Sequence, residues 1–342
     1  MRTLFHPFLP NGPLGDPAVW IDLFDEGRSL LLDLGDLHAI PNRKLLRVDR
    51  VIVTHTHMDH FIGFDQLLRL ALVRERELAI TGPEGFIERV RGRIDGYTWN
   101  VIHDYPVRLR VEEIAAGRVR SVAFTGAGGM RPEPLGEREF DGVIDTRRAY
   151  RIRGAVLDHG VSVLGVVLEE VERLAVDRGR LEALGLRPGE WLRRLKEVVR
   201  AAEPDLTPIE AEEIGGGTRT YSAGELTREI LRRTPGQRLA YLTDVRGTEA
   251  NLARAAELAG GVDLLICETG FLHADRALAT ERGHLTARQA GELARAAGAR
   301  RLAPVHFSAR YGGRERELLD EAATSFGGPI VQLPTGISGT SP

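Results

Sequence analysis

Residues 55–60 read His-Thr-His-Met-Asp-His, and only Thr54 separates them from the apolar run 51–53. Side chains alternate along an extended segment, so His55 and His57 project to the same side, where two imidazoles can meet one metal ion. The turn into a following helix then lets Asp59 and His60 face a neighbouring second ion. The chain has ten histidines among 342 residues, so three within six positions favour a metal site over a solvated loop. The spacing therefore predicts two adjacent metal positions.

Further metal-binding side chains stand where other apolar runs end. His159, Asp244 and His306 each follow a stretch that is predicted to be a buried strand. The ends of such strands share one edge of a sheet, where a cleft forms. Taken alone, each has an ordinary alternative, because a single histidine is more often hydrogen-bonded within the protein and Asp244 can cap a helix that begins near Gly247. Since all three recur beside a histidine cluster, we predict that they complete the metal site.

The order of apolar segments indicates one α/β domain that spans residues 1–342. Strands alternate with amphipathic helices in the first and last thirds, and a strand-rich middle covers about residues 118–170. Between residues 176 and 217 the pattern changes to short helices punctuated by prolines, and it ends in Gly215-Gly216-Gly217. We interpret residues 176–217 as an inserted arm.

Composition excludes several classes of protein. A formal net charge of -3 does not mark the chain as a nucleic-acid binder of the strongly basic kind. The single cysteine, Cys267, has no partner for a disulfide within the chain, and its apolar neighbours predict burial rather than reactivity. No signal-like apolar region and no run of about eighteen apolar residues occur, so we expect a cytoplasmic protein that does not span a membrane.

The histidine cluster and several longer segments together resemble the metallo-β-lactamase superfamily, and in particular its ribonuclease Z branch. The segments are DHGVSVLGVVLEE (158–170), LEALGLRPGEWLRRLKE (181–197), LAYLTD (239–244), DLLICETGF (263–271) and GHLTARQAGELARAAGARRLAPVHFSARY (283–311). The resemblance extends over most of the chain from about Leu30 to Tyr311. It implies an α/β fold, a four-layer αββα sandwich with an inserted helical arm.

The same resemblance implies which residues bind two metal ions. The matching positions divide between one ion (His55, His57, His159), a second ion (Asp59, His60, His306) and a bridge between both (Asp244). Zinc is the expected occupant of both positions, and manganese or iron are alternatives because nitrogen and oxygen ligands also suit them. A metal-bound hydroxide would be the nucleophile, and Asp59 would also act in catalysis by orienting it.

Cleavage of a phosphodiester also needs a proton for the departing alkoxide. His284, in the segment 283–286, matches the family's HST-type histidine, and we expect it to supply this proton or to bind phosphate. Glu268, at the end of a predicted strand, either orients this imidazole or is a structural carboxylate. Thr286 equally fits the cap of the following helix, and Arg310 fits either substrate contact or packing.

The resemblance implies an endonuclease that removes the 3′ trailer of precursor transfer RNA, with residues 176–217 as an RNA-binding exosite and a homodimer as the assembly. The arm keeps Pro188-Gly189 but lacks the family's Pro-Pro-Gly-Pro run. Its basic positions include Arg187, Arg193, Arg194 and Lys196. Two alternatives stay open: a hydrolase of a small phosphodiester or another ester at the same centre, and a metal-stabilised binding protein without enzymatic activity.

Overall fold

The computed structural model describes residues 3–24, 26–171 and 173–336. This part of the chain forms two compact units. The larger unit contains the described residues of Leu4–Ile144, Ile152–Leu168 and Arg238–Pro342, and the smaller one contains those of Asp145–Arg151 and Glu169–Gln237, with Thr3. Among the described residues, no helix combines the length and the apolar character needed to cross a bilayer.

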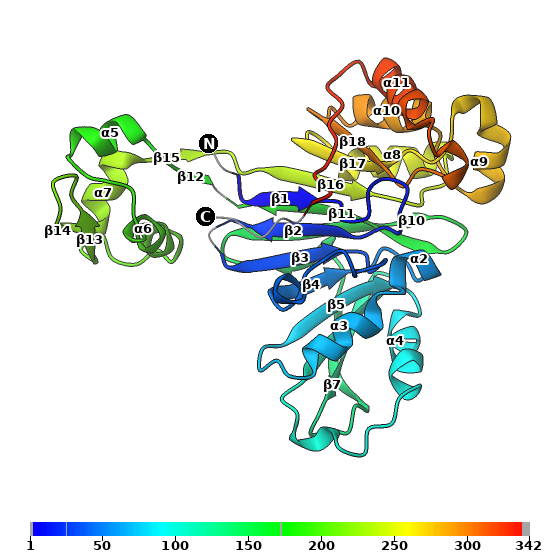
Figure 1. Cartoon of the computed structure of the whole chain (residues 1–342), viewed down its shortest axis with the longest axis horizontal. Helices are drawn as coiled ribbons and strands as arrows, with labels where there is room; N and C mark the ends of the chain where they lie inside the picture. Colours follow the sequence, from blue (N-terminus) through cyan, green and yellow to red (C-terminus); the bar gives the residue numbers. More distant parts are fainter. Residues whose placement is uncertain (1–2, 25, 172, 337–342) are drawn as a thin grey trace. The chain divides into compact units, whose positions relative to one another are not determined.

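An eight-stranded mixed sheet forms one layer of the larger unit (Figure 1). Its strands, in sheet order and chain order alike, are β1 (Phe5–Phe8), β2 (Val19–Leu23), β3 (Arg28–Leu32), β4 (Val48–Ile52), β5 (Leu78–Pro83), β6 (Arg108–Ala115), β7 (Arg118–Thr125) and β8 (Pro132–Glu139). The central strands β3 to β6 run parallel, and antiparallel pairs flank them on both sides. Strand β5 is buried along its whole length, as is typical of parallel strands that are covered on both faces.

A six-stranded sheet forms the second layer. Its order is β18 (Leu302–Val305), β17 (Leu264–Glu268), β16 (Arg238–Leu242), β11 (Ser162–Glu170), β10 (Tyr150–Asp158) and β9 (Val143–Thr146). Strands β16, β17 and β18 run parallel, so their carboxyl ends meet at one edge. The apolar runs of β17 and β18 are buried throughout.

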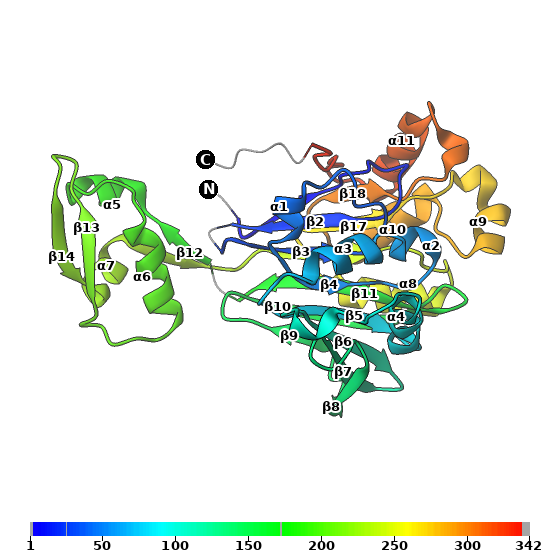
Figure 2. The ribbon, with the colours of Figure 1, turned by 60° about the horizontal axis from the view of Figure 1, so that its bottom comes forward.

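Helices cover the outer faces of both sheets (Figure 2). They are α1 (Asn42–Leu45), α2 (Met58–Phe61), α3 (Phe64–Ala71), α4 (Phe86–Asp95), α8 (Glu249–Leu258), α9 (Arg276–Arg282), α10 (Ala287–Ala296) and α11 (Glu315–Phe326), with short 3-10 turns η1 (Ile102–Asp104), η2 (His273–Asp275) and η3 (Ala309–Tyr311).

Two apolar clusters join each sheet to its helices. Phe64 of α3 and Phe86 of α4 pack in one cluster with Leu31 and Ile80 of the eight-stranded sheet. The second cluster joins α8, α10 and α11 to the six-stranded sheet and includes Cys267, which is buried as predicted. The layers therefore form the αββα sandwich that the family resemblance implies.

The smaller unit has an apolar cluster of its own, formed by side chains such as Leu181, Trp191, Leu195 and Ile209. Its elements are β12 (Arg173–Val176), α5 (Arg178–Ala183), α6 (Trp191–Arg200), β13 (Pro208–Glu212), β14 (Thr218–Ser222), α7 (Ala223–Ile230) and β15 (Leu231–Thr234). Strands β12 and β15 pair with each other, and so do β13 and β14.

This unit encloses the predicted arm of residues 176–217 and continues to Gln237. The glycines at 215–217 do not end the segment, because Gly216 and Gly217 adopt positive φ angles in the turn that joins β13 to β14. In β13, buried Ile209 and Ala211 alternate with exposed or half-buried neighbours, which is the pattern of a strand with one covered face.

A buried ion pair crosses three parallel strands of the larger unit. Arg50 of β4 is 2% exposed, and its Nη1 lies 2.7 Å from Oε2 of Glu112 in β6. Thr81 of β5, between them, donates its hydroxyl to the same carboxylate oxygen at 2.8 Å. Two opposite charges in a buried setting depend on each other, since either one alone would be desolvated without compensation.

We expect Arg50→Met to lower the free energy of unfolding by roughly 1.5 to 3 kcal/mol, because Glu112 would lose a buried charged hydrogen bond to Oε2 and keep only Arg110 as a counter-charge, whose Nη1 lies 3.3 Å from Oε1. The double variant Arg50→Met/Glu112→Gln removes both charges and should recover a large part of that loss. Denaturant titration of the full chain measures both values. A double variant that is destabilised by the sum of the two single effects would contradict the mutual dependence.

Candidate metal centre

The histidine cluster lies where β4 ends and the chain turns into helix α2. His55 is buried, and His57 adopts an extended conformation as the residue before the helix. Asp59 and His60 stand in the helix itself, so the side chains change direction between His57 and Asp59. The alternation before the turn and the helical step after it produce the two-sided arrangement that the spacing predicts.

The three distant residues reach the same place from the ends of other strands. His159 follows β10, Asp244 comes two residues after β16, and His306 follows β18. The ligand atoms of His55, His57, His159 and Asp244 all lie within 4.8 Å of one another. Two further groups satisfy the same limit, namely Asp59, His60 and His306, and Asp244, Glu268, His284 and His306. The structure therefore gathers every predicted site residue in one cluster.

Asp244 lies at the centre of this cluster. Its Oδ2 is 3.2 Å from Nε2 of His55 and 3.2 Å from Nε2 of His60, and it is 3.6 Å from Nε2 of His159. Its Oδ1 is 2.9 Å from Nδ1 of His306. Burial opposes the negative charge, but His306 and His60 lower the pKa of Asp244 well below its ordinary range. One ionised carboxylate thus contacts members of both histidine groups.

Asp244 does not cap a helix, which was the ordinary alternative. The residue that precedes α8 is Thr248, and no side chain makes a capping hydrogen bond there. Thr286 does cap α10, because its hydroxyl accepts the amide of Gln289 while the Gln289 side chain accepts the amide of Thr286. The helix-cap interpretation is therefore wrong for Asp244 and confirmed for Thr286.

Several ring nitrogens of the cluster fit a bound cation. Nε2 of His55, Nε2 of His60 and Nδ1 of His306 are buried and have no hydrogen-bond partner of acceptable geometry among the described residues. His159 faces Asp244 with its Nε2 atom, while its Nδ1 atom lies 2.8 Å from the carbonyl oxygen of Gly283. Buried imidazoles that are held by one nitrogen and open at the other are typical metal ligands. The His/Asp cluster is consistent with a dinuclear metal site.

The backbone is strained at three points of the site. Asp33, Asp244 and His306 all have φ between 55° and 65°, a left-handed conformation that is uncommon for residues other than glycine. They follow β3, β16 and β18, so each strand ends in a sharp turn that points a side chain across the strand ends. Strain of this kind persists only where the surrounding structure enforces it, and it concentrates at functional sites.

A second pair of side chains stands beside the cluster. Nδ1 of His284 lies 2.8 Å from Oε2 of Glu268, and it is 3.8 Å from Oδ1 of Asp244. Glu268 is fully buried, and its other oxygen accepts the backbone amide of Val245. Burial alone would lower the pKa of His284, but the Glu268 carboxylate raises it above its ordinary value.

A cavity of about 310 Å³ gives access to this centre. Its lining includes His57, Asp59, His159, Asp244, His284 and His306, together with Phe271, Arg282 and Phe307. Asp59 is partly exposed at the cavity, whereas His60 is completely buried. Burial opposes the charge of Asp59, but a hydrogen bond from His306 lowers the pKa of this carboxyl to about 2.

Comparison with known proteins identifies the lineage of this chain. A family profile described as the metallo-β-lactamase superfamily matches residues 19–129, and a β-lactamase superfamily domain matches residues 166–307. Ribonuclease Z from Haloarcula marismortui is 30% identical over 322 residues, which cover 91% of this chain and 87% of that protein. Ribonuclease Z from Deinococcus radiodurans is 34% identical over 322 residues, which cover 92% of this chain and 93% of that protein. The chain belongs to the ribonuclease Z family of the metallo-β-lactamase superfamily.

Solved structures agree with this assignment at the level of the fold. Human tRNase Z, short form, matches with a TM-score of 0.53 at 16% identity and covers 98% of both chains. The metallo-β-lactamase fold protein YhfI from Bacillus subtilis matches with a TM-score of 0.53 at 17% identity and covers 97% of both chains. These structures show the fold. Together with the sequence relatives and the His/Asp cluster, they identify the chain as a metallo-β-lactamase hydrolase that is related to ribonuclease Z.

Asp33 contributes to the site, although the sequence pattern did not single it out. Asp33 is completely buried, and its Oδ2 lies 2.9 Å from Nδ1 of His60 and accepts the hydroxyl of Tyr241 at 2.9 Å. Its Oδ1 accepts the backbone amide of Thr54. Asp33 therefore holds His60 so that the Nε2 atom faces the cluster, and it ties β3 to the start of the histidine motif.

We expect Asp33→Asn to weaken binding of the metal ion that His60 is predicted to hold by about 10- to 100-fold, because the amide would turn a donor toward Nδ1–H of His60. The asparagine oxygen can still accept the amide of Thr54, so the fold is expected to survive. Titration of the metal-free protein with zinc against a chromophoric chelator measures the change.

Tyr241→Phe is the matched control, since it removes a different hydrogen bond to the same carboxylate and leaves His60 untouched. We expect that variant to bind both ions within about threefold of the unmodified protein. Equal losses in the two variants would mean that Asp33 supports packing rather than the orientation of His60.

Proposed function

We propose that this protein is an endonuclease that removes 3′ trailers from precursor transfer RNA. The observation that supports this most strongly is the convergence of seven metal-binding side chains beside the His284–Glu268 pair, in a chain that aligns with ribonucleases Z over about 90% of its length. The names of those relatives suggest the RNA substrate, and the site suggests hydrolysis.

We propose zinc for both metal positions, because the ligands are imidazoles and carboxylates. The expected division is one ion on His55, His57 and His159, a second on Asp59, His60 and His306, and Asp244 on both. When bound, such a pair polarises the phosphate and supplies a nucleophile at neutral pH.

The side chains around this centre have separate tasks in the proposed reaction. Asp59 stays ionised because its pKa is about 2, so it can accept a hydrogen bond from the attacking water and orient it. His284 is held through Nδ1 by Glu268, which leaves Nε2 as the atom that can give a proton to the departing alkoxide. The raised pKa of His284 favours the protonated form that this step needs. Glu268 acts through His284 and is a positioning residue.

We expect His284→Ala to lower kcat by about 10²- to 10⁴-fold while two metal ions per chain stay bound, because general acid catalysis contributes that range. Turnover of bis(p-nitrophenyl) phosphate and elemental analysis of the same sample measure the two quantities. Glu268→Gln is the companion variant, and we expect a smaller loss of kcat. Loss of metal from His284→Ala would instead make this histidine a structural residue.

The smaller unit is the proposed RNA-binding exosite, and its acidic residues limit how many of its basic side chains are available to bind phosphate. Acidic residues outnumber basic ones between residues 176 and 217. Arg187, Arg193 and Arg194 each lie within 3.2 Å of a glutamate of the same unit. An RNA phosphate would have to compete with these glutamates for the arginines. Because phosphate contacts release counterions, the affinity that the exosite adds is expected to fall steeply with salt.

Removal of residues 177–230 tests this role. Val176 of β12 is paired with Leu231 of β15, so a two-residue Asn-Gly turn can join them and keep the strand pair. We expect the shortened protein to lose at least about tenfold in kcat/KM for 3′-extended transfer RNA, since phosphate contacts dominate affinity for nucleic acids.

Bis(p-nitrophenyl) phosphate is the control substrate, because it needs the metal centre but no exosite, and its turnover should change by less than about twofold. Equal cleavage of the RNA by both proteins would mean that residues 177–230 are not the exosite. Turnover of the ester by the full chain without cleavage of the RNA would favour a small-molecule phosphodiesterase instead. No turnover of either substrate by the metal-loaded full chain would favour a binding protein. Light scattering of the same preparations tests the homodimer that the family implies.

A further inference from the structure

The cavity at the metal centre contains one unpaired arginine. Among the described residues that line it, Arg282 is the only arginine or lysine. The Arg282 side chain is exposed, and within the described part of the chain its guanidinium makes no hydrogen bond or ion pair. A guanidinium that lines a cavity without a carboxylate partner keeps all its donors available for a ligand.

The backbone beneath Arg282 is held in place by the site itself. Arg282 is the last residue of α9, and Gly283 ends the helix with a φ of 76°. The carbonyl oxygen of Gly283 lies 2.8 Å from Nδ1 of His159, and His284 is held by Glu268 at 2.8 Å. The two residues after Arg282 are thus anchored to a predicted metal ligand and to a buried carboxylate. This anchoring fixes where the arginine enters the cavity.

The other arginine near His306 does not have this freedom. Nη1 of Arg310 is 3.7 Å from Oδ2 of Asp275, and the guanidinium lies over the ring of Tyr311. The Tyr311 hydroxyl in turn donates to Asp275 and accepts the amide of Leu272. Arg310 therefore has partners within the protein around η3, and it is not among the residues that line the cavity.

We propose that Arg282 binds a phosphate oxygen of the substrate in this cavity. The chemistry favours an anionic phosphodiester, because a planar guanidinium presents two parallel N–H donors that match two phosphate oxygens. Arg282 also offsets the carboxylates of Asp59 and Asp244, which line the same cavity and would repel an anion. This inference rests on the proposed hydrolase and names the feature of its substrate that the protein chain recognises.

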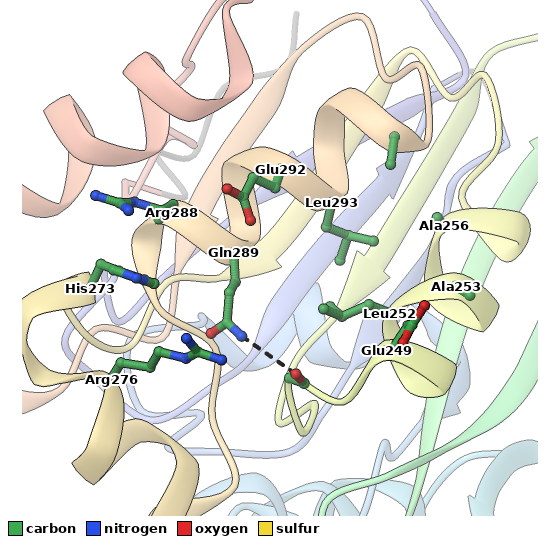
Figure 3. A pocket seen from close by; sticks show the side chains of 12 residues that line it. Glu249, Leu252, Ala253, Ala256, His273, Arg276, Arg288, Gln289, Glu292 and Leu293 are labelled. Atoms are coloured by element: carbon green, nitrogen blue, oxygen red, sulfur yellow. Dashed lines mark hydrogen bonds between the residues drawn. The ribbon is translucent and has the colours of Figure 1, made fainter.

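Arg276 is a matched control on the same helix. It is the first residue of α9, is exposed, and also lacks a partner among the described residues. It lines a different cavity of about 670 Å³, which α8 and α10 flank, and there it lies beside His273 and Gln289 (Figure 3). Arg276→Gln and Arg282→Gln therefore remove the same charge from the same helix, but only one of them changes the cavity at the metal centre.

The test measures inorganic phosphate binding to the zinc-loaded full chain by calorimetry, and KM and kcat for bis(p-nitrophenyl) phosphate. We expect Arg282→Gln to raise both the Kd for phosphate and KM on the order of tenfold, because a hydrogen bond to a charged group is lost. Arg282→Lys should be intermediate, and Arg276→Gln should stay within about twofold. Zinc content and Tm should be the same in all four proteins.

Phosphate affinity within twofold of the unmodified protein in both Arg282 variants would overturn the proposal. A loss of zinc or a lowered Tm in both would overturn it as well, since Arg282 would then support the structure. Failure of the proposed function is visible separately: the unmodified protein would leave 3′-extended transfer RNA intact while its phosphate affinity still depended on Arg282.

Discussion

Asp244 is the group on which the arrangement of the site depends. Its two oxygens lie within 3.6 Å of four histidines that come from three separate parts of the chain. A buried carboxylate is unfavourable without compensation, so the chain has to bring positive or hydrogen-bonding groups to it. The neighbouring residue Val245 is also tied down, because its amide donates to Glu268. After β16, Asp244 is therefore held by the histidines, and the next residue, Val245, is held by Glu268.

The αββα sandwich makes this convergence possible with little extra structure. Parallel strands place their carboxyl ends at one edge, and β4, β16 and β18 all end at the site. The two sheets are also connected directly there, since Tyr241 of β16 donates its hydroxyl to Asp33 after β3. The carboxylate that orients His60 thus also accepts a hydrogen bond that joins the two layers. Fold and site share the same few interactions.

The predictability of each residue follows from how local its signal is. His55, His57, Asp59 and His60 are readable from sequence, because strand alternation and one turn decide where they point. His159, Asp244 and His306 needed the assumption that strand ends meet. The parallel pairing of β16, β17 and β18 bears this out for Asp244 and His306, whereas His159 reaches the site from the turn between β10 and β11. Asp33 gave no such signal: it looks like any polar residue at a strand end, and its partners lie 21 to 208 residues away in sequence.

The extent of the smaller unit was equally hard to predict, for a different physical reason. Three consecutive glycines ordinarily end an element, and in this chain they form the turn of a hairpin whose second strand continues the unit. The pairing of β12 with β15 holds the two ends of this segment together, and at Val176 and Leu231 it joins residues more than 50 positions apart. Local composition cannot report such a pairing.

The strain at the site has a thermodynamic consequence for the whole larger unit. Three residues with left-handed backbones and a group of packed imidazoles are each unfavourable in isolation. The unsatisfied nitrogens of His55, His60 and His306 add a desolvation cost. A cation that binds these atoms removes part of that cost in the folded state, and the unfolded chain offers no preformed cluster. Metal binding to this cluster would therefore stabilise the folded state, so the side chains that are proposed to bind the ions would also make stability depend on them.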